Sequence, residues 1–280
     1  MLSVKNNLDL KLQSNLNHQT ICQYQYSSHP LRLSPIFRLE GVNSHRAYLY
    51  LINTSPGLLA GDRLNLNIEL GAKSNLYFTD QAATKVHSMP IVNTKASLDY
   101  QISLDEYSSL EIVPEPLILY EDAVLEQKTT IKLHPTAKLF ISEIILPGRL
   151  AKQEYYKFNY YFNCLEIKDF NEQLLFKEAM CLEGKNNPYK NQKLFSSLPI
   201  IGNAIAILPN TEINLLINKI NTNYNSEQGL QIATTILPYD NGLAIRALAD
   251  KTIKLKKLFN NILNQIRIDN QQQPLPYIPK

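Results

Sequence analysis

The stretch from Thr54 to Val86 carries glycines, an acid and a Lys-Ser pair at spacings that invite comparison with a phosphate-binding loop. Such a loop needs Gly-x-x-x-x-Gly-Lys-Ser/Thr between a strand and a helix, so that backbone N–H groups and the lysine surround the phosphates. Here Asp62 follows Gly57 and Gly61 where lysine should stand, and strand-like alternation comes next. The spacing argues against a nucleotide site. The two glycines instead favour a tight connection with positive φ.

Histidine and cysteine are present but are not clustered. The sequence has no His-x-His or His-Glu-x-x-His pair, no Cys-x-x-Cys pair and no Gly-x-Ser-x-Gly elbow, which argues against a preformed zinc-type site, a disulfide framework and a serine hydrolase. Three unpaired cysteines favour a cytoplasmic protein. The residues concerned are His18, His29, His45, His87, His134, Cys22, Cys164 and Cys181.

Carboxylates are the remaining candidates for chemistry. Asp62, Glu143 and Asp169 lie near the ends of expected strands or inside them, and a pair of acids could act as general acid and base. The sequence alone brings no two of them together. Glu143 stands within the apolar run FISEIIL, so it either faces solvent through strand alternation or lies in a polar space inside the protein. Both alternatives remain open.

Period-two alternation dominates the elements that would position these residues, and it predicts a mostly β protein. Turn residues recur about every ten residues, a spacing typical of all-β architectures. Gly71 is expected to close a hairpin opened by the preceding strand, and Pro114 and Pro116 indicate a sheet edge or corner. A polar turn near Asn171 separates two further strands. The main expected strands of this region are 64–70, 98–104, 129–133 and 138–146.

The last third of the chain changes character. Strands are expected near 200–208 and within LQIATTIL and GLAIRALA, and helical spacing predicts two helices at about 211–221 and 251–267. We expect one domain over 1–280, with a β body at about 1–182, an α+β part at about 200–268 and an extended or loose tail at 269–280. The polar segment 183–193 marks the boundary between the first two.

Composition excludes several classes of protein. Of the 280 residues, 44% are hydrophobic and 19% are charged, which indicates a folded globular chain. A net charge of +3 without a dense basic run argues against nucleic acid as a partner. No stretch approaches the ~18 apolar residues of a membrane helix, and the first residues do not resemble a signal peptide.

Three ordered blocks of the chain resemble one known family, the urease accessory proteins called UreD or UreH. The blocks are SPGLLAGDRLNLNIELGAKSNLYFTDQAATKV, LEIVPEPLILYEDAVLEQKTTIKLHPTAKLFISEIILPGR and NGLAIRALADKTIKLKKLFNNILNQIR. The resemblance implies an elongated, β-helix-like body with two helices in the C-terminal half. It also implies a non-enzymatic assembly scaffold for nickel urease, with UreF, UreG and apo-urease as partners, no tightly bound cofactor, and nickel in transit through an internal channel.

The resemblance gives these residues roles. Transit needs weak oxygen ligands rather than a tight His and Cys site, so Asp62 and Glu143 are expected on the nickel path. Arg246 is expected to bridge a sheet to a helix or to face a partner, and Lys85 to pair with an acid. No partner-binding residues are predicted. The motif residues expected to fix the backbone are Gly57, Gly61, Gln81, Thr84, Lys85, Gly148, Arg149 and Arg246.

The chain departs from the family pattern at three places. Leu58, Leu59 and Ala60 replace further glycines, Asp80 stands where a small hydroxyl residue is usual, and LAKQE follows Arg149. Roles for Asp80 and His87 stay open. Two alternatives to the scaffold are a hydrolase that uses acids near Asp62 and Glu143, and a carbohydrate-binding β module that stacks sugars on some of the 16 tyrosines.

Overall fold

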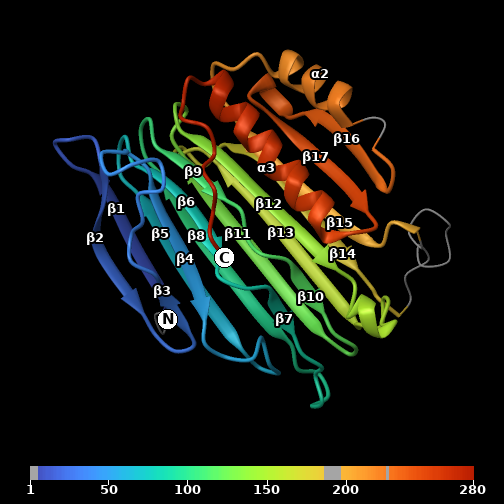
Figure 1. Ribbon diagram of the computed structural model, residues 1–280. Coiled ribbons are helices and arrows are strands. Elements are labelled where there is room, and N and C mark those ends of the chain that lie inside the picture. Colours follow the sequence, from blue (N-terminus) through green and yellow to red (C-terminus); the bar gives the residue numbers. More distant parts are fainter. Residues whose placement is uncertain (1–5, 186–196, 225–226) are drawn as a thin grey trace.

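Two β-sheets face each other in the computed structural model, and two helices cover the outer face of one of them (Figure 1). The structure describes residues 6–185, 197–224 and 227–280. Within these residues no helix combines the length and apolarity needed to cross a bilayer. The predicted mostly β fold with two helices in the C-terminal half is confirmed. Of the boundary segment 183–193, residues 186–193 lie outside the described part of the chain.

The first sheet has seven strands. In spatial order they are β14 (Leu174–Leu182), β13 (Tyr160–Lys168), β11 (Val124–Leu133), β8 (Ala96–Leu104), β5 (Arg63–Leu70), β1 (Leu8–Ser14) and β2 (Thr20–Ser27).

The second sheet has ten strands. Its main order is β16 (Leu230–Ile236), β17 (Gly242–Ala249), β15 (Ile200–Ile207), β12 (Lys138–Leu146), β9 (Ser109–Ile112), β6 (Asn75–Asp80), β4 (Ala47–Asn53) and β3 (Leu31–Leu33). The short strand β10 (Leu117–Leu119) pairs with β12 and with β7 (Thr84–Val86). Within the residues that the structure describes, the helices are α2 (Ile213–Tyr224) and α3 (Thr252–Asp269), and single 3₁₀ turns lie at Leu150–Lys152 and Pro238–Asp240.

From β5 to β13 the chain passes repeatedly from one sheet to the other, with the short strands β7 and β10 as extra members of the second sheet. The strands of each sheet pair in parallel in this region, so the chain winds as a flattened coil. Leu64 pairs with Leu98, 34 residues later, and Leu98 pairs with Gln127, 29 residues later. Unequal turn lengths explain why the sequence shows no fixed repeat. The winding matches the β-helix-like body that the family resemblance implies.

The hairpin expected at Gly71 is wrong. Strand β5 already pairs in parallel with β1 and β8, so neither of its edges is available to the strand that follows Gly71. The turn therefore carries the chain across to β6 in the second sheet. The hairpin near Asn171 is confirmed, because β13 and β14 pair antiparallel around it.

Alternation places the apolar rows where the sequence predicts them. Leu64, Leu66, Ile68 and Leu70 are buried and belong to the core between the two sheets. A second core lies between the outer face of the second sheet and the helices. Its helical members are Ile213, Leu216, Ile220, Leu255, Leu258, Phe259, Ile262, Leu263 and Ile266.

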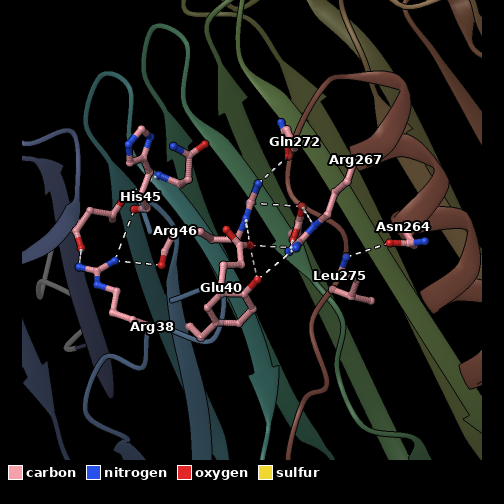
Figure 2. A network of polar contacts seen from close by, with 12 residues as sticks. Arg38, Glu40, His45, Arg46, Asn264, Arg267, Gln272 and Leu275 are labelled. Carbon is pink, nitrogen blue, oxygen red and sulfur yellow. Dashed lines mark hydrogen bonds and ion pairs between the residues drawn. The ribbon is translucent and has the colours of Figure 1, made fainter. Parts of the chain in front are cut away.

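Arg267, in the last turn of α3, is the largest fully buried side chain and lies in a network of charges (Figure 2). Its Nε donates to Glu111 Oε1 at 2.9 Å, and its second terminal nitrogen donates to Glu111 Oε2, which gives a bidentate pair. Its remaining nitrogen donates to Glu40 at 3.0 Å and to the Tyr48 hydroxyl oxygen at 3.1 Å. Burial lowers the pKa of Arg267, but the pull of Glu111 and Tyr48 outweighs it and the net shift is upward.

Arg46 completes the network. Its guanidinium lies 3.4 Å from Glu40 and 3.2 Å from Glu111, and it donates to the Gln272 side chain at 2.7 Å. Two buried guanidinium groups thus balance the buried carboxylate of Glu111 and the partly buried carboxylate of Glu40, as buried charges require. The network fixes the end of α3 and the start of the tail against β4 and β9.

Replacing Arg267 by Met should be strongly destabilising. The change leaves Glu40 and Glu111 buried with one guanidinium between them, and breaking one side of a buried pair costs about 3–5 kcal/mol. Urea unfolding followed by circular dichroism measures the loss. The exposed Arg63→Met, on β5, is the matched control and should keep the wild-type midpoint. Adding Glu111→Gln to Arg267→Met should recover part of the loss, and an unchanged midpoint in the single variant would contradict this account.

Candidate functional site

A cavity of about 120 Å³ lies between the two sheets. One buried water needs about 10–15 Å³ of such space together with polar partners, so the cavity has room for several waters. Its wall is apolar in part, but polar side chains come from both sheets. The polar residues of the lining are Thr79, Asp80, Thr84, Tyr100, Glu115, Gln127, Thr129, Ser142, Glu143, Asn163, Glu178 and Asn203.

Strand register gathers these polar side chains into facing rows. In the second sheet Glu143 pairs with Asn203, which pairs with Arg246 on the next strand. In the first sheet Gln127 pairs with Asn163. Since side chains at paired positions of neighbouring strands lie on one face of a sheet, each row turns the same way, here toward the cavity. The site is thus a product of register between distant segments.

Glu143 lies at the centre of this arrangement. The Tyr161 hydroxyl donates to its Oε1, Asn163 Nδ2 lies 3.2 and 3.1 Å from its two oxygens, and Gln127 Nε2 lies 3.5 Å from Oε1. Removal from bulk water raises the pKa of Glu143, although the hydrogen bonds from Tyr161 and Asn163 oppose the rise. Of the two alternatives left open by the sequence, the interior polar space is therefore the one found.

Asp80, at the end of β6, also lines the cavity. Burial raises its pKa to about 7, against the opposing charge of Lys280. A smaller cavity of about 30 Å³ shares Asp80, Thr84 and Tyr100 with the first and continues toward Asn53. The Asp80 carboxyl therefore lies where the two cavities adjoin.

Charged pairs stand at the edges of the cavity. Glu178 on β14 accepts from Arg246 on β17 at 2.6 Å, so Arg246 bridges the two sheets. The expected bridge from sheet to helix is wrong, because Arg246 occupies an inward position of its strand. Glu115 lines the cavity on the side of the helices and pairs with Lys256 of α3 and with Lys280 of the tail.

The arrangement suits weak binding of a hydrated cation. Its ligands are carboxylate, amide, hydroxyl and carbonyl oxygens, and among the described residues no three His, Cys, Asp or Glu side chains gather closely enough to hold a metal ion. Oxygen ligands without imidazole or thiolate bind nickel loosely compared with nitrogen and sulfur ligands. The Asn163 Oδ1 atom is buried and has no hydrogen-bond partner among the described residues, which leaves an acceptor at the cavity wall for water or a cation.

Asp62 lies outside this site. Its carboxylate accepts from the Leu59 N–H at 2.7 Å and so caps the surface turn, and Asp62 is not among the residues that line the cavity. The two acids of the proposed hydrolase, Asp62 and Glu143, are thus not brought together.

The glycine-rich connection is held by close backbone contact. A Cβ added at Gly57 would lie 2.4 Å from the Lys85 carbonyl oxygen, and the His87 ring packs over the same turn, with Nε2 3.2 Å from the Pro56 carbonyl oxygen. Gly61 also has positive φ but meets no atom within 4 Å. Positive φ and tight approach are both reasons for glycine.

The QAATK segment is held to neighbouring strands and loops by hydrogen bonds of its own main chain. The N–H groups of Gln81 and Thr84 donate to the carbonyl oxygens of Leu51 and Pro116 at 2.9 and 3.0 Å. Lys85 is exposed and pairs with no acid among the described residues, contrary to expectation.

The turn after β12 is held by Arg149. Its Nε donates to the buried Glu154 at 2.7 Å, and its guanidinium lies 4.5 Å above the Tyr120 ring. Gly148 has positive φ, and a Cβ there would lie 2.0 Å from the Glu154 carbonyl oxygen.

Sequence reasoning missed most of the cavity wall. The sequence predicts no role for Asn163, Glu178 and Asn203, because an amide or acid in an alternating strand gives no sign of which sheet it will face. A usable signal exists at Asp80, whose departure from the family pattern coincides with a position that turns inward.

Comparison with known proteins finds sequence similarity to one family. A family model described as "UreD urease accessory protein" matches residues 5–280. A "Urease accessory protein UreD" of Trichodesmium erythraeum (strain IMS101) is 48% identical over 276 residues, which cover 98% of this chain and 99% of that protein. Proteins of the same name from Photorhabdus laumondii and Bacillus cereus are 32% and 27% identical over 211 and 218 residues, covering 74% and 76% of this chain and 65% and 77% of theirs.

The two glycines of the connection should differ in their tolerance of alanine. Gly61→Ala should cost about 1 kcal/mol, the penalty for positive φ alone. Gly57→Ala should cost about 2 kcal/mol more, because its Cβ also meets the Lys85 carbonyl and overpacking adds about 1–3 kcal/mol. Urea unfolding of both variants provides the measurement, and equal losses would show that close approach at Gly57 is unimportant.

Asp80 should make stability depend on pH. Because its folded pKa is raised from 3.8 to about 7, its favourable contribution is complete below about pH 4 and is lost as the pH rises through 7. The slope is at most about 1.4 kcal/mol per pH unit in that window. Asp80→Asn should therefore match the wild type near pH 4 and exceed it near pH 8 in urea unfolding. A difference that stays constant with pH would contradict the assignment. Lys280 and Glu115 are the charged groups that face this carboxyl.

Proposed function

Because this chain belongs to the UreD urease accessory protein family, we propose that it helps to assemble nickel urease by letting nickel ions pass through the cavity between its two sheets. The role in urease assembly follows from the family. The passage of nickel rests on one observation, the polar cavity that contains Glu143 and Asp80.

The chemistry of the cavity supports transit rather than storage. A channel must bind an ion strongly enough to admit it and weakly enough to release it. Glu143 offers a carboxylate whose oxygens are already shared with Tyr161 and Asn163, so an incoming cation competes with hydrogen bonds from the protein. Asp80 lies further along, where the smaller cavity begins. A cation would meet separate weak sites in succession.

The remaining parts of the proposal follow from the family resemblance. We propose UreF, UreG and the urease subunits as partners, an accessory rather than catalytic role, no tightly held cofactor and a cytoplasmic location. The three cysteines are free, as suits a reducing compartment.

The two alternatives have less support. The hydrolase considered above uses two acids at one site, and Asp62 and Glu143 lie in different places. A carbohydrate module needs exposed aromatic rings, whereas several of the tyrosines fill the cores. The buried ones are Tyr48, Tyr50, Tyr77, Tyr156 and Tyr161.

Glu143→Gln should lower the nickel content and activity of urease several-fold when the chain is co-expressed with the urease subunits and their accessory proteins. The amide keeps the size of the side chain and removes the charge that attracts the cation. Metal analysis of purified urease gives the nickel content. Circular dichroism and co-purification with the partners test whether fold and assembly are retained.

Asp62→Asn is the matched control for this experiment. It also removes one carboxylate charge, but its side chain can still cap the surface turn, and we expect urease to receive the wild-type amount of nickel. Full nickel loading with Glu143→Gln would remove the cavity from the proposed path. Equal losses of urease nickel in both variants would mean that nickel delivery depends on acidic charge at either position and not on the cavity.

A further inference from the structure

The tail after α3 has no regular secondary structure, but several of its residues contact the rest of the protein. Gln272 accepts from Arg46, and the Leu275 N–H donates to Asn264 Oδ1 at 2.8 Å (Figure 2). Leu275 and Ile278 pack against the core between the helices and the second sheet. The tail thus runs across this sheet and ends near its middle strands (Figure 1).

These contacts bring Lys280 to the edge of the cavity. Its ammonium donates to Thr79 Oγ1 and to the Asp80 carbonyl oxygen, both at 2.7 Å, and lies 2.8 Å from Glu115 Oε1. All three residues line the cavity. A cationic group therefore already occupies a set of three converging oxygens, supplied by a hydroxyl, a carbonyl and a carboxylate.

We propose that Thr79, Asp80 and Glu115 form a binding site for a divalent metal cation at the helix-side edge of the cavity, and that the Lys280 ammonium fills it as a displaceable stopper. This inference rests on the proposed function of the cavity as a cation path. Oxygen atoms of these three kinds are the ligands of hard divalent cations, and nickel binds the same atoms at least as well as manganese does.

The local charges explain how a lysine closes the site. Glu115 carries one negative charge, Lys256 and Lys280 carry one positive charge each, and the Asp80 carboxyl adds a second negative charge only as the pH rises through about 7. With Lys280 in place the sum is therefore between +1 and zero, which does not attract a cation. Without Lys280 the sum lies between zero and −1, and the three oxygens lose the ammonium that they bind. The Lys280 side chain is still 30% exposed, so its ammonium can move into water when a cation takes its place.

Lys280→Met tests the proposal. The variant keeps the tail in place through Gln272, Leu275 and Ile278, and it removes only the ammonium. Isothermal titration of the full chain with nickel(II) should show several-fold tighter binding than the wild type. Lys257→Met is the matched control, because Lys257 is an exposed lysine beside Lys256 on α3, and it should give the wild-type isotherm.

The double variant Lys280→Met with Glu115→Gln locates the gained affinity. If the site is the one described, the double variant should lose the gain. Wild-type affinity in Lys280→Met, or a gain that survives Glu115→Gln, would overturn the proposal.

The titration contains no urease, so its result is separate from the activation experiment. Reduced urease loading by Glu143→Gln together with an unchanged isotherm for Lys280→Met would leave the nickel path standing and remove the lysine stopper. Tighter binding by Lys280→Met together with full urease loading by Glu143→Gln would support the lysine stopper and remove the nickel path.

Discussion

The packing of two sheets formed by one winding chain is the constraint on which the rest of the structure depends. Strands β5 to β13 pass from sheet to sheet, so every second residue of each strand points into a shared interior. Most of these positions are apolar and form the core. Where Glu143, Asn163 and Asn203 take such positions, their polar groups must find partners inside the protein. The cavity is the space in which they do so.

The cavity encloses the carboxyls of Glu143 and Asp80 without giving either of them a full set of charged partners. Enclosure keeps Glu143 and Asp80 away from bulk water and raises the pKa of both carboxyls, so each is less firmly charged than a surface acid. Glu178 and Glu115, nearer the edges, are paired with basic side chains instead. The acids of the wall are therefore either paired with basic side chains or weakened by burial, as the proposed passage of a divalent cation requires.

The sequence predicted the elements better than their partners. Alternation over 64–70 and the apolar stripe of α3 depend on local spacing, and both are confirmed. The type of turn at Gly71 depends on whether β5 has a free edge, and the pairing of β5 with β1 and β8 leaves none. Likewise Glu143 faces inward because its strand is covered by the other sheet, and the pairing of Arg267 with Glu111 joins residues that are 156 positions apart. Contacts between residues so far apart in the sequence produce no local pattern from which they could be predicted.

Two polar centres lie on opposite faces of the second sheet, and they differ in the partners of their charged groups. Around Arg267 two guanidinium groups and two carboxylates face one another at short distances, and the charges cancel within a well-packed core. Around Glu143 the partners are neutral amides and a hydroxyl, and Asn163 Oδ1 keeps a free acceptor. At the first centre the charges neutralise one another, and the ion pairs fix α3 and the tail. At the second centre Glu143 has neutral partners, and the proposed passage of a cation needs an acid of this kind, which no basic side chain of the protein neutralises.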